Sequence, residues 1–346
     1  MMKTFYSPAH LEHAPSEEFE GGRMNPAVEV PLRALRVRDE IERRKIGPIL
    51  APSDFGMDAI ARVHDAGLVK FLGEASGLWR RRYGEAAPPA IPSAWPARGL
   101  RAQPDGDVES RLGSYAFDTA TPIVKGTWPA ALAAANSALS AARAIKDGAR
   151  AAFALARPPG HHASADVFGG YCYLNNVAIA AQWFVDQGLK PAILDVDYHH
   201  GNGTQSIFYR RSDVFFCSIH GDPSFAFPHF LGFADERGEG AGAGANLNLP
   251  LPMYTDWEGY ADAMARAAEA ILSFGPDVLL VSLGLDTFEA DPISKFKLRA
   301  ADYLKMGETI AKLKLPTFFI FEGGYNLDAL AEITVNVLEG YQSAAR

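Results

Sequence analysis

Two aspartates, two histidines and an asparagine lie within the short stretch 195–202 near the middle of the chain. Alternate side chains of a strand share a face, so we expect Asp195, Asp197 and His199 to point the same way. A carboxylate and an imidazole two residues apart at the end of a strand suit a divalent metal ion. Without a cation, these groups would carry large costs of desolvation and repulsion. The spacing therefore predicts part of a metal site rather than a set of loop caps.

Polar side chains also follow four other apolar runs that have the composition of buried strands. In an open parallel sheet, the carboxyl ends of the strands form the ligand crevice, so all five loops should meet at one place. The four segments are Arg157–His162, Ser218–His220, Gly284–Asp286 and Glu322–Tyr325.

Asp286 is the natural third metal ligand, because it ends an apolar strand beside Gly284. Taken alone, Asp286 would more simply cap a helix. Together with Asp197 and His199 it provides oxygen and nitrogen ligands and leaves coordination positions open. Such a set suits Zn²⁺ or another first-row ion such as Fe²⁺, Mn²⁺ or Co²⁺.

Two adjacent histidines, His161 and His162, follow a Pro-Pro-Gly turn. Adjacent side chains diverge, so two core histidines here would each need a separate buried partner. Asp195 and Asn202 are candidate partners, and we therefore predict a pair of histidine dyads.

Apolar strands that alternate with helices must position these groups. Their order predicts an α/β fold, with a mostly parallel sheet covered by helices on both faces, in one domain spanning residues 1–346. We expect Thr127 to cap the helix that it begins. The predicted strands are 3–6, 151–156, 192–194, 214–220, 278–283 and 317–321, and the predicted helices are 31–44, 59–78, 127–146, 175–186, 203–211, 257–274, 301–313 and 327–338.

Five prolines between about residues 84 and 107 exclude a regular element from that segment. A loop of this length is usually functional or involved in assembly. A mobile surface excursion is an equally good interpretation of the sequence.

The composition limits the class of protein. With 346 residues and 48% hydrophobic content, the chain can bury a substantial core. A formal net charge of −8 argues weakly against nucleic-acid binding and is compatible with a cationic substrate. Two cysteines, Cys172 and Cys217, cannot form a disulfide framework, and no segment has the pattern of a signal peptide or a membrane span. We expect a cytoplasmic protein.

The chain resembles the zinc-dependent histone deacetylase family, which has the arginase–deacetylase fold, over nearly its whole length. Within that family it is most similar to the bacterial acetylpolyamine amidohydrolases, which share the Pro-rich segment and the Pro-Pro-Gly-His-His motif. The motifs that carry the resemblance are Pro159–His162, Gly170–Asn176, Asp195–Gly203, Asp286–Pro292 and Glu322–Tyr325.

The resemblance implies that Asp197, His199 and Asp286 hold Zn²⁺, with the two histidines beside the bound water. It pairs His161 with Asp195 and His162 with Asn202, where many relatives carry Asp. An amide stabilises imidazolium less than a carboxylate does, so His162 is the better candidate for a neutral general base. Tyr325 would donate its hydroxyl to the tetrahedral oxyanion.

Further roles follow from the resemblance alone. Tyr171 and Phe227 match the aromatic walls of the acyl tunnel. Glu109 matches an acidic position that polyamine enzymes use for a distal ammonium, and the Pro-rich insertion implies a homodimer. A structural K⁺ ion would be held by the Ser218 hydroxyl and by backbone oxygens of Asp195, Asp197, His199 and Ile219.

We therefore expect a metal-dependent amidohydrolase that deacetylates a small cationic amine such as acetylputrescine or acetylcadaverine. Acetyl-lysine peptides present the same acetamide and are the first alternative. A ureohydrolase with two Mn²⁺ ions needs further Asp ligands, but Gly284 stands at one such position. A non-catalytic acetyl-amine sensor is the third reading, and it would not require a proton-transfer set.

Overall fold

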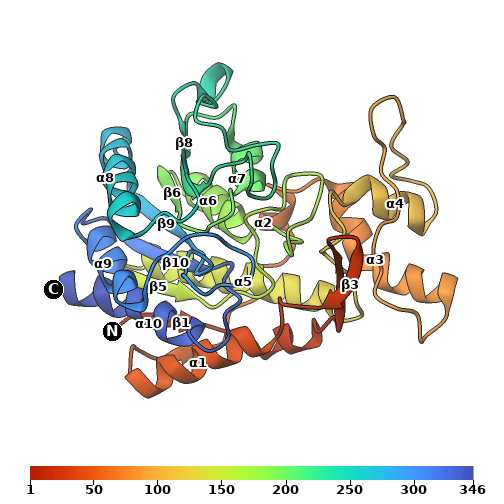
Figure 1. The fold of residues 1–346 in the computed structure, drawn as a ribbon, viewed down its shortest axis with the longest axis horizontal. Coiled ribbons are helices and arrows are strands. Elements are labelled where there is room, and N and C mark those ends of the chain that lie inside the picture. Colours follow the sequence, from red (N-terminus) through yellow and green to blue (C-terminus); the bar gives the residue numbers. More distant parts are fainter. Residues whose placement is uncertain (346) are drawn as a thin grey trace.

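A central parallel β-sheet organises the computed structural model, which describes residues 1–345 (Figure 1). Within these residues the sheet has eight strands in the order β4-β1-β5-β10-β9-β6-β7-β8, and every neighbouring pair is parallel. The strands are β1 (Lys3–Phe5), β4 (Ile49–Leu50), β5 (Ala151–Ala154), β6 (Pro191–Asp195), β7 (Phe215–Gly221), β8 (Asn246–Leu251), β9 (Val278–Leu283) and β10 (Thr317–Phe321). A separate antiparallel hairpin pairs β2 (Glu17–Glu20) with β3 (Arg23–Pro26).

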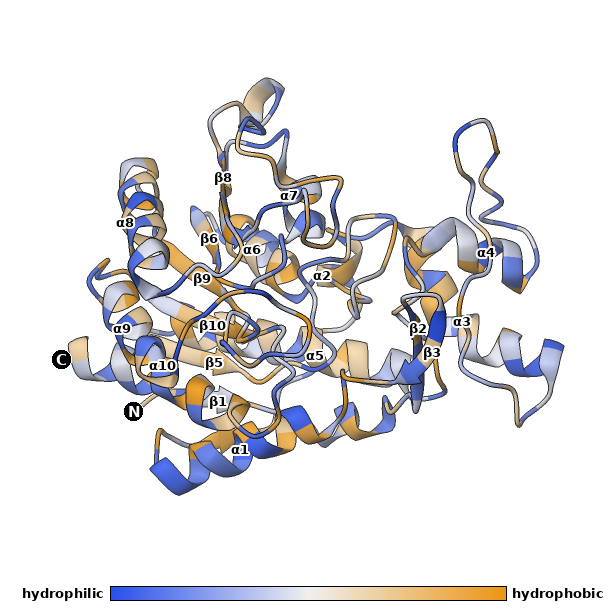
Figure 2. Cartoon of the chain, viewed as in Figure 1, coloured by the Kyte–Doolittle hydropathy of each residue, from blue (hydrophilic) through white to orange (hydrophobic). Residues whose placement is uncertain are grey.

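Helices cover both faces of the sheet and give the chain its three layers. One apolar core joins the strands to α1 (Leu32–Arg44), α8 (Trp257–Phe274), α9 (Ala300–Ala311) and α10 (Leu330–Ala344). A second core joins the opposite face to α5 (Thr127–Lys146), α6 (Asn176–Asp186) and α7 (Asn202–Phe208). In Figure 2 the strands are mainly hydrophobic, whereas the outer faces of the helices are hydrophilic. The predicted α/β architecture is confirmed.

The inner strands form because their side chains are apolar on both faces. Every residue of β6, β9 and β10 is buried, which matches the continuous apolar runs of a sheet covered on two sides. The chain builds the sheet outward through β7 and β8 and then returns, so that its last strand, β10, lies between β5 and β9. The carboxyl ends of β6, β9 and β10 are therefore adjacent.

Local predictions were wrong at three places. The expected helix 59–78 is two helices, α2 (Asp58–Ala61) and α3 (Ala66–Tyr83), because Asp65 caps the second with its side chain. The hydroxyl of Thr127 does not cap α5; it accepts a hydrogen bond from the Val124 N–H and contacts His13. Residues 17–26, for which no strand was predicted, form the β2–β3 hairpin, whose turn is made by Gly21 and Gly22 at positive φ.

The Pro-rich segment 84–107 connects α3 to α4 (Val108–Tyr115) without a helix or a strand of its own. It is attached at Ala90, which forms an antiparallel bridge with Ile123. Its middle projects away from the sheet in Figure 1, where it is drawn in orange. Among the helices of residues 1–345, none is both long and apolar enough to cross a bilayer.

Glycines allow α9 and α10 to pack closely. A Cβ atom on Gly307 would lie 2.0 Å from the carbonyl oxygen of Val337, and one on Gly340 would lie 2.1 Å from that of Leu304. The backbones of the two helices are therefore in contact at both positions.

Gly307→Ala should lower the free energy of unfolding by about 1–3 kcal/mol, because the added methyl group overlaps backbone that cannot move aside. Denaturant unfolding followed by circular dichroism measures this. Gly77→Ala in α3 is the control, since its new Cβ would meet only the end of Arg81 at 3.6 Å. Equal stability of the two variants would contradict the close packing.

Candidate active site

Three buried side chains offer ligand atoms to one point at the carboxyl edge of the sheet. Asp197 and His199 follow β6, Asp286 follows β9, and their ligand atoms lie within 4.8 Å of one another. His199 Nδ1 lies 2.8 Å from Asp286 Oδ2 and 3.4 Å from Asp197 Oδ1. Two buried carboxylates and an imidazole at this spacing fit a divalent cation such as Zn²⁺.

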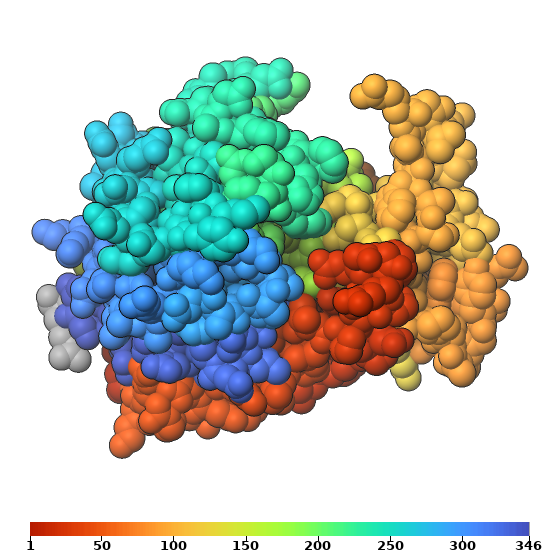
Figure 3. Space-filling view, in the orientation of Figure 1, coloured from red at the N-terminus to blue at the C-terminus, as the bar shows by residue number. Residues whose placement is uncertain are grey.

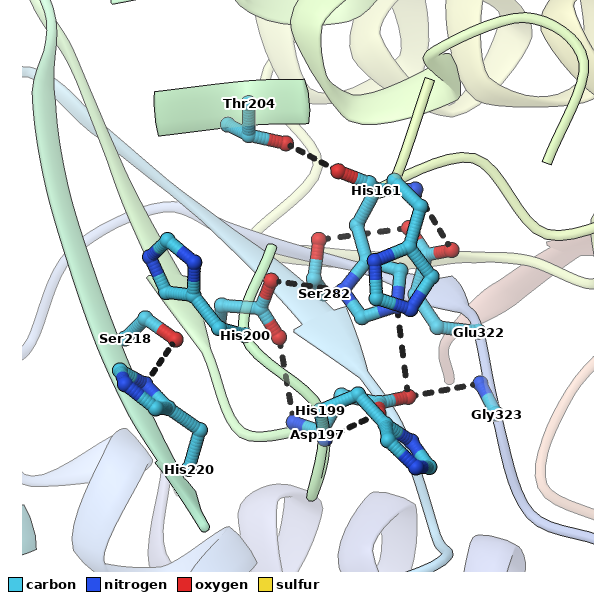
Figure 4. A network of polar contacts seen from close by, with 12 residues as sticks. His161, Asp197, His199, His200, Thr204, Ser218, His220, Ser282, Glu322 and Gly323 are labelled. Carbon is cyan, nitrogen blue, oxygen red and sulfur yellow. Dashed lines mark hydrogen bonds and ion pairs between the residues drawn. The ribbon is translucent and has the colours of Figure 1, made fainter. Parts of the chain in front are cut away.

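Backbone amides orient the two carboxylates. Asp197 accepts hydrogen bonds from the N–H of His199 at 2.9 Å and from the N–H of Gly323 at 2.8 Å. Asp286 accepts one from the N–H of Tyr198 at 2.8 Å. Figure 4 shows the Asp197 carboxylate in contact with His161 on one side and with the backbone of Gly323 on another. Such contacts fix a ligand before the metal binds.

Two glycines leave the space that these carboxylates occupy. A Cβ on Gly284 would lie 1.9 Å from Asp197 Oδ2. A Cβ on Gly323 would lie 2.5 Å from the same oxygen and 2.6 Å from Asp286 Oδ2. An Asp at position 284, as a second metal ion of a ureohydrolase would require, does not fit here.

His162 has the geometry of a neutral base. Its Nδ1 lies 2.6 Å from Asn202 Oδ1, and the Asn202 amide nitrogen donates to the His162 carbonyl at 3.3 Å. That second bond orients the amide so that its oxygen faces the ring, which places the proton on Nδ1 and leaves Nε2 as the acceptor. Burial and the nearby His161 and His199 hold the pKa of His162 well below its ordinary value.

His161 has the opposite environment. Its Nδ1 lies 2.9 Å from Asp195 Oδ2, and its Nε2 lies 3.9 Å from Asp197 Oδ2. Burial opposes the charged form, but the Asp195 and Asp197 carboxylates outweigh it and raise the pKa of His161 to about 10. The adjacent rings, with centroids 4.0 Å apart, thus favour different protonation states.

Glu322 holds the backbone that leads into the histidine pair, and the sequence did not reveal this contact. Its Oε2 accepts hydrogen bonds from the N–H of Gly160 at 2.7 Å and from the N–H of His161 at 3.2 Å. Burial raises the pKa of Glu322 to about 7, partly offset by His161. A glutamate directly after a buried strand was the available signal.

The Tyr325 turn is held by Arg33, which sequence reasoning also missed. The guanidinium of Arg33 donates to the carbonyls of Gly324 and Glu322, both at 2.6 Å, and lies 4.7 Å from the centroid of the Tyr325 ring. Arg33 is fully buried, whereas the other four arginines of α1 are half-buried or exposed. Only its place on the apolar face of α1 distinguishes it.

Glu29 compensates Arg33 and a second buried arginine, Arg157. One oxygen of Glu29 accepts from both guanidinium groups, each at 2.8 Å. Arg157 also donates to the carbonyls of His10 and His13 at 2.7 and 2.8 Å. The N-terminal segment is thereby connected to the turn that carries Tyr325.

A pocket lined by His162 and His199 opens between aromatic walls. The Phe227 ring lies 5.1 Å from that of His162, and the Tyr171 ring lies 5.5 Å from that of Tyr325. Tyr171 donates its hydroxyl to Glu18 on the β2–β3 hairpin at 3.0 Å. The structure thus brings both predicted tunnel residues to the pocket lining.

The other predicted residues lie at two separate places. Ser218 is directly opposite Asp195 in the β6–β7 pairing, and Ile219 is the next residue of β7. Glu109 lies on α4, where its carboxylate accepts from the Tyr83 hydroxyl, and it is not part of the pocket lining of its own chain. A contact between Glu109 and the pocket therefore requires a second copy of the chain.

Comparisons with known proteins find relatives that cover nearly the whole chain. A model of the histone deacetylase domain matches residues 27–341. The chain is 49% identical to acetylpolyamine amidohydrolase 2 of Pseudomonas aeruginosa, with 100% of both proteins covered. It is 44% identical to the acetylpolyamine amidohydrolase of Mycoplana ramosa, covering 98% of this chain and 99% of that one.

Solved structures show the same fold. The crystal structure of acetylpolyamine aminohydrolase from Burkholderia pseudomallei superimposes with a TM-score of 0.95 at 38% identity and covers 99% of both chains. The HD domain of HDA15 superimposes with a TM-score of 0.82 at 25% identity, covering 99% of this chain and 90% of that one.

Gly284→Ala should weaken Zn²⁺ binding roughly ten- to hundredfold, because the new methyl group displaces the Asp197 carboxylate. Competition with a chromogenic chelator measures the affinity, and circular dichroism verifies the fold. The Gly77→Ala variant should bind Zn²⁺ as the unaltered protein does. An unchanged Zn²⁺ affinity of the Gly284→Ala variant would show that Asp197 is not a metal ligand.

Asn202→Asp should move the acidic limb of the pH–rate profile upward by about one to two pH units. A carboxylate facing His162 stabilises its imidazolium and raises its pKa, so the base becomes protonated at a higher pH. The pH dependence of kcat/KM measures the limb, and near-ultraviolet circular dichroism verifies that the isosteric variant folds normally. A limb that stays in place would argue against His162 as the base.

Proposed function

This chain belongs to the histone deacetylase family and is a deacetylase, and on that premise we propose that it hydrolyses small N-acetylated polyamines. The single observation that carries the proposal is a pair of carboxylates, from Glu20 and Asp118, in the lining of the pocket. No ion pair within 4.0 Å joins either carboxylate to a cation of residues 1–345. An alkylamine with its acetamide at the metal would bring its distal ammonium toward this acidic side.

Asp118 is prepared for such a donor. Its Oδ2 accepts the N–H of Gly170 at 2.6 Å, while its Oδ1 is buried without a hydrogen-bond partner. Burial raises the pKa of Asp118 to about 6, although the hydrogen bond from Gly170 acts in the opposite direction and lowers it. An ammonium group beside Asp118 would offset the cost of keeping this carboxylate charged.

Asp197, His199 and Asp286 would hold the metal ion, most simply Zn²⁺. When bound, such an ion supplies Lewis-acid polarisation of the acetyl carbonyl and lowers the pKa of a water molecule. Fe²⁺, Mn²⁺ and Co²⁺ suit the same donors.

The side chains of the chain divide the proton transfers between them. His162 Nε2 accepts a proton as water attacks the acetyl carbonyl, and it returns that proton to the leaving amine. Tyr325 donates its hydroxyl to the developing oxyanion; Arg33 and the backbone turn hold its ring in place. His161, kept positive by Asp195, stabilises negative charge without competing as a base. Hydrolysis releases acetate and the free amine.

Three further features belong to the proposal. Ser218 and Ile219, beside Asp195 and the Asp197–His199 backbone, would hold a structural K⁺ ion. Two copies would form a homodimer through the projecting 84–107 segment, so that Glu109 of one copy extends the acidic rim of the other. The protein would act in the cytoplasm.

Acetyl-lysine peptides are the competing substrates, because their acetamide and methylene chain fit the same aromatic walls. They carry no free ammonium at the matching distance from the acetamide, so Glu20 and Asp118 would contribute less to their binding. A sensor without catalysis has no observation in its favour, since His162 is arranged to accept a proton.

The Zn²⁺-loaded protein should hydrolyse N-acetylputrescine with a higher kcat/KM than an acetyl-lysine peptide. Glu20→Gln should reduce kcat/KM for N-acetylputrescine by about fivefold, as expected for one partly exposed charge pair, with little change for the peptide. Glu17→Gln is the matched control, because Glu17 stands on the same hairpin but is not part of the pocket lining. A clear preference for the peptide would refute the polyamine assignment.

A further inference from the structure

Lys295 places a positive charge in the lining of the same pocket. It belongs to a segment, 294–299, in which buried and exposed residues alternate as they do along a strand. Phe296, the buried neighbour of Lys295, packs its ring 4.8 Å from that of Tyr198, and Lys295 accepts a hydrogen bond from the Tyr254 N–H through its carbonyl at 2.8 Å. The backbone of Lys295 is thus fixed beside the metal-binding loop.

The other cations of this segment are already in use. Lys297 donates to the Glu289 carbonyl at 3.2 Å and lies over the Tyr254 ring, and Arg299 lies 3.8 Å from the Glu289 carboxylate. By contrast, no carboxylate of residues 1–345 lies within 4.0 Å of the Lys295 ammonium. Its charge is available to a ligand in the pocket.

The lining of the pocket therefore carries both negative and positive charge. Glu20 lies on the β2–β3 hairpin and Asp118 on the loop after α4, whereas Lys295 comes from the segment between β9 and α9. Figure 3 shows this face hollowed between the hairpin, in red, and the blue segment that contains residue 295. The distal ammonium of a monoacetylated diamine can pair with the acidic side, but such a substrate offers no counter-charge to Lys295.

We propose that Lys295 binds a carboxylate, so that the pocket also accepts free ω-acetamido-α-amino acids such as Nε-acetyl-L-lysine. The proposal rests on the deacetylase function given above and extends its substrate class. The acetamide would take the position of the acetylpolyamine head, the α-ammonium would meet Glu20 and Asp118, and the α-carboxylate would meet Lys295. Water cleaves the amide to acetate and free lysine, with the same proton transfers through His162.

Nε-Acetyl-L-lysine and N-acetylcadaverine form a matched pair that isolates this contact. The same number of carbon atoms separates the acetamide from the free amine in both molecules, and only the amino acid carries the carboxylate. Any change in their relative kcat/KM on substitution of Lys295 therefore reports on that group and not on the depth of the tunnel.

Lys295→Met removes the charge and keeps most of the length of the side chain. We expect kcat/KM for Nε-acetyl-L-lysine to fall about fivefold at low salt, through a higher KM and an unchanged kcat, as for the loss of one exposed charge pair. kcat/KM for N-acetylcadaverine should stay the same or rise. The difference between the two substrates should shrink as ionic strength rises, because salt screens an exposed pair.

Lys297→Met is the control, since Lys297 is two residues away but does not belong to the pocket lining. It should leave the ratio of the two kcat/KM values unchanged. If Lys295→Met also leaves the ratio unchanged while N-acetylcadaverine is turned over, the Lys295 proposal fails and the deacetylase function stands. If the Zn²⁺-loaded protein hydrolyses neither compound, the proposed substrate class fails and the Lys295 contact fails with it.

Discussion

Four buried carboxylates meet at the carboxyl ends of three neighbouring strands, and the rest of the site compensates their negative charge. They belong to Asp195, Asp197, Asp286 and Glu322. Each would cost several kcal/mol if it were left uncompensated in the interior. Backbone N–H groups satisfy one part of this demand, His161 satisfies another, and the remainder attracts a metal ion. The same negative charge keeps His161 protonated, and that positive charge in turn helps to keep His162 neutral. One constraint thus produces both the metal site and the difference between the two histidines.

A second group of buried charges stabilises the turn that carries Tyr325. Arg33 and Arg157 share Glu29, and both guanidinium groups use their remaining donors on backbone carbonyls, including those of the Tyr325 turn. Removing one member of such a network lowers the stability of the fold strongly, because it leaves a buried charge unpaired. The N-terminal segment, α1 and the end of β10 are consequently fixed relative to one another, although they are far apart in the sequence.

The sequence predicts most of the fold because the inner strands are apolar on both faces and each ends in polar residues. The same rule brings Asp197, His199 and Asp286 together without knowledge of the fold, since strand ends meet at one edge. It could not predict contacts that depend on tertiary packing. From the sequence, Arg33 looks like any other arginine of an amphipathic helix. The hydroxyl of Thr127 contacts His13 instead of capping its helix. Glu18 and Glu20 lie in a stretch for which no strand was predicted, so neither the contact of Glu18 with Tyr171 nor the acidic side of the pocket could be inferred.

The position of β10 affects how the protein is made. This strand is synthesised last, yet it lies between β5 and β9 and brings Glu322, Gly323 and Tyr325 to the site. Until it emerges from the ribosome, β5 and β9 each present an unpaired edge, and the nascent chain holds two incomplete half-sheets. The histidine pair and the metal ligands then stand on separate halves of the chain, without the strand that joins them. Catalytic competence therefore requires β10, whereas the three metal ligands, which follow β6 and β9, already stand on one half-sheet. A chain that is cut short before β10 has two exposed sheet edges and lacks Tyr325.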